Sequence, residues 1–280
     1  MTRRQPVEYE RIGELMVHPD YLKALSGNGL CDLGALLETP GENRLDKRGL
    51  ASWRQRLVLA LDTSNGVQKC YLKRFTKPPL RQQFMNLLAG FVSTAEVEFH
   101  WIRELTGLGI ATPQVVACGS RRNGIREVAS LLLTAELHGE SLEKWLPGRA
   151  ASLGRNMKRS LSQSLAALVA KLHSAGLVHR DLYMSHIFIT AEAENDINLS
   201  LLDLQRVVRT RWRKWRWIVK DLAALNYSIP FSVATNADRV RWLKLYLDIR
   251  SVSANQRTLI RAVVRKTCRI ARHSAKHGLG

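Results

Sequence analysis

The sequence predicts an α+β fold in two parts, a strand-rich N-terminal portion with an antiparallel sheet and a helix-rich C-terminal portion. Two observations support this division. Short apolar segments separated by turn-forming residues continue to residue 133, and helical spacing of apolar residues dominates from Leu137 onward. The pattern changes near Glu136–Gly139, so we expect parts comprising residues 1–136 and 137–280. Residues 1–50 are mixed in pattern and could belong to the first part or form a separate arm.

Two hairpins and two helices are predicted in the N-terminal part. The turn formers Asn65-Gly66 and Asn123-Gly124 each separate a pair of apolar segments, which is the pattern of a β-hairpin. Between the hairpins, apolar residues recur at helical spacing in two stretches. The expected strands are Arg56–Leu61, Gln68–Arg74, Val115–Cys118 and Glu127–Leu133, and the expected helices are Arg81–Phe91 and Thr94–Thr106.

A long amphipathic helix opens the C-terminal part. Leu161, Leu165, Leu168 and Leu172 mark its apolar face, and Gly176 is expected to end it. A short strand pair, Ile187–Thr190 and Asn198–Leu202, follows a loop, and the remainder of the chain has helical patterning.

The charge balance points to a polyanionic partner. A net charge of +19 and a pI near 10.4 suit nucleic acid, an anionic membrane, lipopolysaccharide or an acidic protein. Nucleic acid is the least favoured, because no RRM, KH, zinc or helix-turn-helix signature is present. The scattered cysteines form no CxxC pair, and neither a secretory signal nor a membrane-spanning run is visible. We therefore expect a cytoplasmic protein that is peripheral on the inner face of the cytoplasmic membrane, with an anionic membrane surface as a partner.

Three separated segments carry the residues that phosphoryl transfer requires. Val178-His179-Arg180-Asp181-Leu182 places a carboxylate on a loop after a helix, and Leu201-Leu202-Asp203 ends an apolar strand with another. Cys70-Tyr71-Leu72-Lys73 is a strand that ends in a lysine. In protein-kinase-like enzymes such residues orient the acceptor hydroxyl, bind Mg²⁺ and position the phosphates of ATP. Asp181, Asp203 and Lys73 are the respective candidates.

A lysine in this role usually pairs with a glutamate from a helix, and two glutamates compete. Ser93-Thr94-Ala95-Glu96 reads as a capping box, which would occupy Glu96 at the helix start. Glu98 shares its helical face with Ile102 and Leu105 and should point inward. We therefore expect Glu98 to be the partner of Lys73.

The motifs as a set resemble the lipopolysaccharide kinase family, the inner-core heptose and Kdo kinases, over roughly residues 55–230. The resemblance is carried by His179-Arg180-Asp181-Leu182-Tyr183-Met184-Ser185-His186-Ile187-Phe188, by Asp203-Leu204-Gln205-Arg206, and by a basic aromatic segment ahead of Lys220-Asp221-Leu222. It implies a bilobed protein-kinase-like fold and transfer of the γ-phosphate of ATP to a heptose or Kdo hydroxyl. It also implies that Asp221 braces the catalytic loop.

The sequence departs from the ordinary kinase pattern at three places. Gln205 replaces the glycine of the DFG motif, which disfavours a flexible switch there. His186 stands where protein kinases have a metal-binding asparagine, so it could bind the metal or contact phosphate or water. No GxGxxG covers the phosphates, and Lys47-Arg48-Gly49 could form a substitute loop. These departures leave two alternatives open: a pseudokinase-like module that binds an anionic membrane or polymer, and an atypical basic kinase acting on protein.

The C-terminal segment adds a cationic helix face. Arg257, Arg261, Arg265 and Arg269 recur every four residues, opposite apolar positions such as Leu259. This helix could pack on the core with its charges in water, or it could bind an anionic leaflet.

Overall fold

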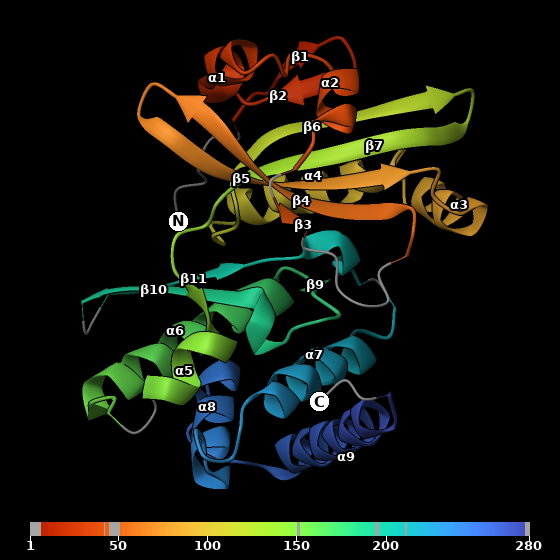
Figure 1. The fold of residues 1–280 in the computed structure, drawn as a ribbon. Coiled ribbons are helices and arrows are strands. Elements are labelled where there is room, and N and C mark those ends of the chain that lie inside the picture. The colour runs from red at the N-terminus through yellow and green to blue at the C-terminus, as the bar shows by residue number, and fades with distance from the viewer. Residues whose placement is uncertain are drawn as a thin grey trace. The chain divides into compact units, whose positions relative to one another are not determined.

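The computed structural model describes residues 7–41, 43–44, 51–149, 152–193, 196–210 and 212–277. The chain divides into two compact units, Met1–Leu137 and His138–Gly280. Lys47 and Gly49, the expected phosphate loop, lie outside the described residues. The fold combines an antiparallel sheet in the first unit with a largely helical second unit (Figure 1).

A seven-stranded antiparallel sheet forms the framework of the first unit, as far as the described residues show. Its spatial order is β1-β2-β6-β7-β5-β4-β3, so strands from the start of the chain flank both edges. The segment before residue 50, considered as a possible arm, therefore contributes three strands to this sheet. The strands are β1 (Glu10–Ile12), β2 (Leu15–Val17), β3 (Asn43–Arg44), β4 (Arg54–Thr63), β5 (Gly66–Thr76), β6 (Val115–Asn123) and β7 (Arg126–Ala135).

The two faces of this sheet contact different helices. Side chains alternate along a strand, so Leu72 of β5 enters a core with α1 (Leu22–Gly27) and α2 (Leu33–Glu38), next to η1 (Pro19–Tyr21). Lys73 consequently points to the opposite face, where α4 (Thr94–Gly107) packs. Arg74, again on the first face, donates to the carbonyl oxygen of Leu36 at 2.6 and 2.9 Å and so attaches α2 to the sheet.

Helix α4 follows a short helix, α3 (Leu80–Leu88). The first turn of α4 resembles the expected capping box but differs from it in the hydrogen bond that the Glu96 side chain accepts. The Ser93 side chain accepts a hydrogen bond from Glu96 N at 3.3 Å, as expected of an N-cap. The Glu96 carboxylate, however, accepts from Val92 N at 2.7 Å. The hydrogen bond from Val92 N thus holds the Glu96 side chain at the start of α4.

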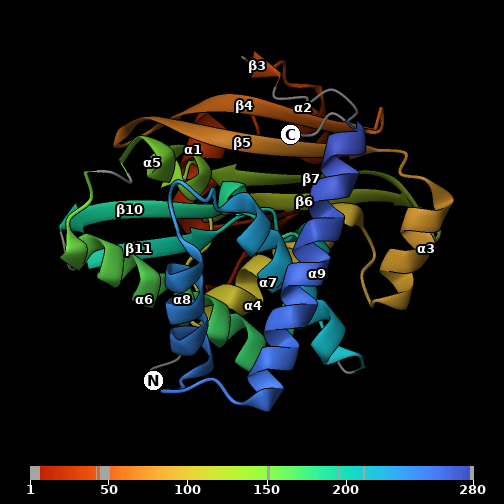
Figure 2. The same cartoon turned by 90° about the horizontal axis from the view of Figure 1, so that it is seen from below.

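Helices dominate the second unit, and short strands connect them (Figure 2). The amphipathic stretch around Leu165 forms the long helix α6, and Gly176, with φ +76°, allows the chain to turn just after it. The strands form a three-stranded sheet, β11-β10-β8, and a pair, β12-β9. The elements are β8 (Glu140–Ser141), α5 (Leu142–Arg149), α6 (Arg155–Ser174), β9 (Leu177–Val178), η2 (Met184–His186), β10 (Ile187–Ala193), β11 (Asp196–Leu201), η3 (Leu204–Arg206), β12 (Val208–Arg209), α7 (Lys214–Ser228), α8 (Asn236–Leu247) and α9 (Ala254–His277).

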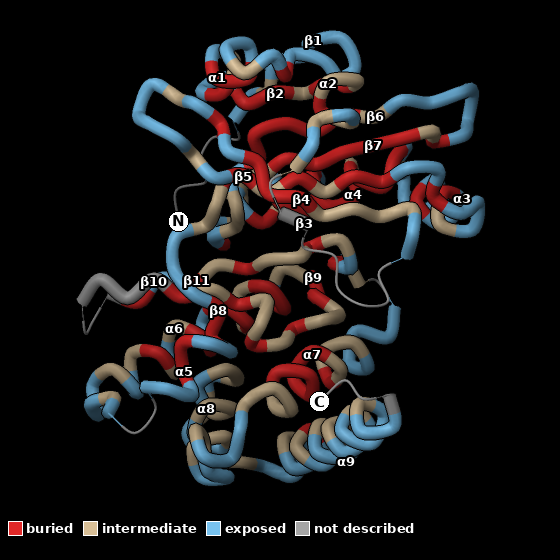
Figure 3. The backbone as a smooth tube through the Cα atoms, in the orientation of Figure 1, coloured by how far each residue is buried: buried red, intermediate tan, exposed pale blue. Residues whose placement is uncertain are grey.

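Pairing of β9 with β12 brings the candidate segments of this unit together. Val178 lies opposite Val208, so the loop that starts at His179 runs beside the segment between Asp203 and Arg206. The buried elements around these loops are β9 and the middle of α7, whereas α9 exposes most of its length (Figure 3). None of the described helices combines the length and apolarity needed to cross a bilayer.

Candidate active site

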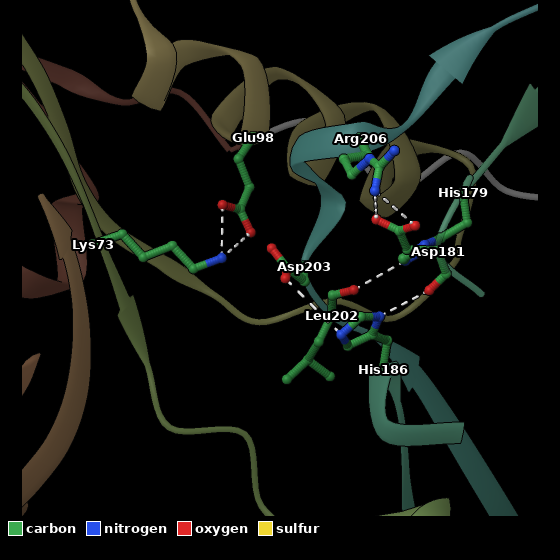
Figure 4. Close-up of polar contacts among 8 residues, drawn as sticks. All are labelled: Lys73, Glu98, His179, Asp181, His186, Leu202, Asp203 and Arg206. Atoms are coloured by element: carbon green, nitrogen blue, oxygen red, sulfur yellow. Dashed lines mark hydrogen bonds and ion pairs between the residues drawn. The ribbon is translucent and has the colours of Figure 1, made fainter. Parts of the chain in front are cut away.

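Lys73 and Glu98 form a close ion pair within the first unit (Figure 4). Lys73 Nζ donates to both carboxylate oxygens of Glu98, at 2.7 and 2.8 Å. The Glu98 residue is only 4% exposed, on the inward face of α4. Both oxygens of this buried carboxylate are therefore used to orient a single ammonium group. Glu96, the competing glutamate, lies at the helix start instead.

In the second unit, Asp221 of α7 braces the loop that carries Asp181. Its fully buried carboxylate accepts hydrogen bonds from His179 N and Arg180 N, both at 2.7 Å. His173 Nε2 lies 3.3 Å from the same carboxylate. Arg180 has φ +71°, an uncommon conformation for a non-glycine residue, so its backbone needs this support. The resemblance predicted such a bracing aspartate, and the geometry fits that role.

Asp181 is held by two cations from the same unit. Arg206 Nη1 lies 3.0 Å from Oδ1 and 2.8 Å from Oδ2 of Asp181 (Figure 4). Lys220 Nζ lies 3.7 Å from Oδ1. Burial lowers the pKa of Lys220, and the positive charges of Arg206 and Arg180 lower it further, whereas Asp181 opposes the shift. The carboxylate is consequently fixed in orientation within a cationic surrounding.

Neither cation was assigned a contact with Asp181 from the sequence. Arg206 was noted within the Asp203-Leu204-Gln205-Arg206 motif and Lys220 within the motif that contains Asp221. These motifs were the available signal. The pairing of β9 with β12 brings Arg206 to Asp181, and the hydrogen bonds from the loop backbone to Asp221 place the neighbouring Lys220 there.

His186 connects the Asp181 loop with Asp203. Its Nδ1 lies 2.8 Å from the backbone oxygen of Asp181, and a carbonyl can only accept, so Nδ1 carries the proton. In the neutral ring, Nε2 then presents a lone pair, and this atom lies 3.9 Å from Oδ2 of Asp203 (Figure 4). Asp203 itself has φ +55°, in the left-handed region, directly after Leu202, whose carbonyl oxygen lies 3.0 Å from His179 Nε2.

These two donors fit a divalent cation that also binds substrate. Histidine ligands usually donate their other N–H to a carbonyl or carboxylate, as His186 does to Asp181. Among the described residues no group of three or more His, Cys, Asp or Glu side chains could hold a metal by itself. Mg²⁺ is commonly held by one or two carboxylates together with phosphates and water, and Asp203 is a carboxylate that could hold it in this way. Imidazole is a softer ligand than Mg²⁺ prefers, so Asp203 is the stronger of the two donors.

An antiparallel sheet with a lysine–glutamate pair, together with a braced acidic loop and a second acid after a strand, defines a protein-kinase-like phosphotransferase. The family model for "Lipopolysaccharide kinase (Kdo/WaaP) family" matches residues 44–246. The chain belongs to this family of lipopolysaccharide kinases. It is an ATP-dependent kinase that phosphorylates a sugar hydroxyl, heptose or Kdo, of the lipopolysaccharide inner core.

Individual relatives agree with this membership. The chain is 30% identical over 191 residues to the lipopolysaccharide core heptose(I) kinase WaaP of Pseudomonas aeruginosa, covering 66% of this chain and 71% of that protein. It is 28% identical over 219 residues to the same kinase of Escherichia coli, covering 75% and 82%. A solved structure, "WaaP in complex with acyl carrier protein", is similar with a TM-score of 0.70 at 25% identity, covering 91% of this chain and 98% of that one.

Proposed function

We propose that the chain transfers the γ-phosphate of Mg-ATP to a heptose hydroxyl of the lipopolysaccharide inner core, with Asp181 orienting that hydroxyl. The observation that carries the proposal is the connection through His186. This ring bonds to the backbone oxygen of Asp181 and faces the carboxylate of Asp203. The two acidic residues therefore lie on either side of one imidazole ring.

Each residue has a distinct task in this proposal. Lys73, oriented by Glu98, would bind the nearer phosphates of the nucleotide, and Asp203 with His186 would hold Mg²⁺. When bound, Mg²⁺ would neutralise charge that develops on the phosphates. Asp181 accepts a hydrogen bond from the acceptor hydroxyl and directs its oxygen toward the γ-phosphate. Such positioning supplies much of the catalysis in phosphoryl transfer.

The acceptor is proposed to be a heptose because both named bacterial relatives are core heptose(I) kinases. The cations beside Asp181 support an acidic saccharide. Arg206 and Lys220 both lie within 4 Å of its carboxylate, a cationic surrounding suited to phosphate or carboxylate groups on the sugar.

We also propose an acidic carrier protein as partner and a place on the inner face of the cytoplasmic membrane. The solved relative is titled as a complex with acyl carrier protein, and the net charge of +19 suits an acidic partner. Helix α9 packs against α7, where Asn226 Nδ2 donates to Thr267 Oγ1 at 3.0 Å. Its four regularly spaced arginines, 257, 261, 265 and 269, are all exposed. The helix thus packs on the unit and keeps a cationic face that could contact anionic lipid.

The experiment is a kinase assay with labelled ATP and defined acceptors. Purified enzyme is offered dephosphorylated lipopolysaccharide core oligosaccharide and, separately, generic protein acceptors. Phosphate on the heptose and none on protein is the expected result. Label on protein alone would contradict the proposal, and no label on any acceptor would favour the pseudokinase-like module.

Variants test the residue roles. Asp181→Ala and Asp203→Ala should each abolish transfer while the fold survives, and Glu98→Gln should lower it by roughly tenfold or more through loss of the charged partner of Lys73. Glu96→Gln is the matched control, since it makes the same change on the same helix away from Lys73. Parent-like turnover by Asp203→Ala would show that the metal assignment is wrong.

A further inference from the structure

The apolar face of helix α3 is exposed to solvent. Phe84, Leu87 and Leu88 share a helical face with Leu80, which is the pattern that usually faces a core. Here these side chains point outward, and the tube in Figure 3 is mostly exposed along this helix. The exposed fractions are 63% for Leu80, 61% for Phe84, 56% for Met85, 40% for Leu87, 68% for Leu88 and 41% for the nearby Val92.

Polar contacts on the inner side fix this orientation. The buried Gln83 amide accepts from Glu127 N at 2.8 Å and donates to the backbone oxygen of Pro78 at 2.6 Å. The buried Asn86 amide donates to Thr94 Oγ1 at 3.2 Å. Rolling the helix to bury its apolar side would leave these amides and Glu127 N without partners, which opposes such a rotation.

The surroundings of the apolar face are basic. Lys77 and Arg81 are exposed on α3 and its approach, and residues 77–95 contain no acidic side chain. The contact of Gln83 with Glu127 N places α3 beside the start of β7, next to the tip of the β6–β7 hairpin. This tip carries exposed Arg122 and Arg126 around Ile125, which is 75% exposed. Figure 1 shows α3 at the same end of the sheet as this tip.

The two acids that border this region are already used within the fold. Glu96 accepts a hydrogen bond from Val92 N at 2.7 Å. The buried Glu127 carboxylate accepts from Thr94 N and Thr94 Oγ1, both at 2.9 Å, and from Ser130 Oγ. The Glu127 carboxylate is therefore bound to groups inside the unit. The exposed charged side chains named around the apolar face are all basic.

We propose that α3 is a membrane anchor that inserts its apolar face into the interface of an anionic bilayer. An apolar helix side bordered by lysine and arginine is the pattern of helices that lie in the headgroup region. A protein partner would require complementary acidic residues around a matching apolar groove, whereas an anionic leaflet supplies both features continuously. The anchor rests on the proposed function in one respect: its purpose would be to keep the kinase beside an amphiphilic acceptor.

The test uses vesicles without lipopolysaccharide or nucleotide, so that it is independent of kinase activity. Full-length protein is floated with vesicles of phosphatidylglycerol and phosphatidylcholine, or of phosphatidylcholine alone. The double variant Phe84→Ser/Leu88→Ser should bind the anionic vesicles far less than the parent protein does, by roughly tenfold for each side chain removed. Val67→Ser is the matched control, because Val67 is an isolated side chain that is 71% exposed in the same unit.

Three results would overturn the proposal. The double variant could bind like the parent protein, or binding could be equal on both vesicle types, or binding could be lost only in a charge-reversed α9 such as Arg261→Glu/Arg265→Glu. A dimer in size-exclusion chromatography that the double variant converts to monomer, with vesicle binding unchanged, would identify the face as an interface between copies. Retained activity of the double variant on the water-soluble core oligosaccharide is expected, and it separates failure of the anchor from failure of the kinase proposal.

Discussion

Replacing Asp221 should destabilise the second unit, because this carboxylate supports the backbone of the catalytic loop. It is 0% exposed and accepts two short hydrogen bonds, from His179 N and Arg180 N. Asp221→Ala leaves both N–H groups without a partner, and at about 1–3 kcal/mol for each buried unpaired group the loss is about 4 kcal/mol. Asp221→Asn keeps the volume and one acceptor oxygen but turns an NH₂ group toward the other donor, so about 2 kcal/mol is expected.

The assay is equilibrium urea unfolding at pH 7, followed by circular dichroism, with the phosphotransfer rate measured on the same samples. Asp248→Asn is the control, since Asp248 is exposed and asparagine accepts its left-handed conformation, with φ +52°. We expect Asp221→Ala to lose the most free energy of unfolding and Asp221→Asn to lose less. The free energy of unfolding of Asp248→Asn should be close to that of the parent protein. An Asp221→Asn protein whose free energy of unfolding equals that of the parent would refute the reasoning.

Two further predictions concern buried groups that can ionise. Burial lowers the pKa of His179 below its ordinary 6.5. Near and below pH 6.5 the unfolded chain therefore binds a proton at this residue more readily than the folded chain does. The free energy of unfolding should consequently fall as the pH drops below about 6.5. Thermal midpoints between pH 5 and 7.5 should show this slope, and an unchanged slope in His179→Gln would exclude His179 as its source. Burial also raises the pKa of Cys70 to about 12 and raises that of Cys118, so a thiol reagent at pH 8 should label only the exposed cysteines of the folded protein and all four after unfolding. Rapid labelling of four thiols without denaturant would contradict the burial. The exposed pair is Cys31 and Cys268.

Much of the local structure could be predicted because its signals are local. Asn65-Gly66 predicts the turn between β4 and β5, which then pair from Arg54 with Phe75 to Thr63 with Gly66. Helical spacing likewise separates Glu98, on the inward face, from Glu96 at the helix start, and the contact of Glu98 with Lys73 follows from that difference. Short range patterning thus accounts for one pair of site residues.

Other features depend on tertiary contacts that no local pattern encodes. The strands β1 to β3 are two or three residues long and acquire strand geometry by pairing, β2 with β6, β1 with β2, and β3 with β4. Arg206 reaches Asp181 only because β9 and β12 pair. On α3, the usual inward assignment of apolar residues fails because Gln83 and Asn86 have specific polar partners on the inner side.

The position of β2 in the sheet has a consequence for how the chain can be shortened. Its residues pair with β6, Leu15 with Gly119 and Val17 with Ala117, about a hundred positions later. Deleting the first fifty residues, a natural choice when a catalytic domain is trimmed for expression, would leave unpaired the backbone groups of β6 that face β2, while the pairing of β6 with β7 remains. Such a bare edge recruits strands from other molecules, so the trimmed protein should precipitate or form inclusion bodies.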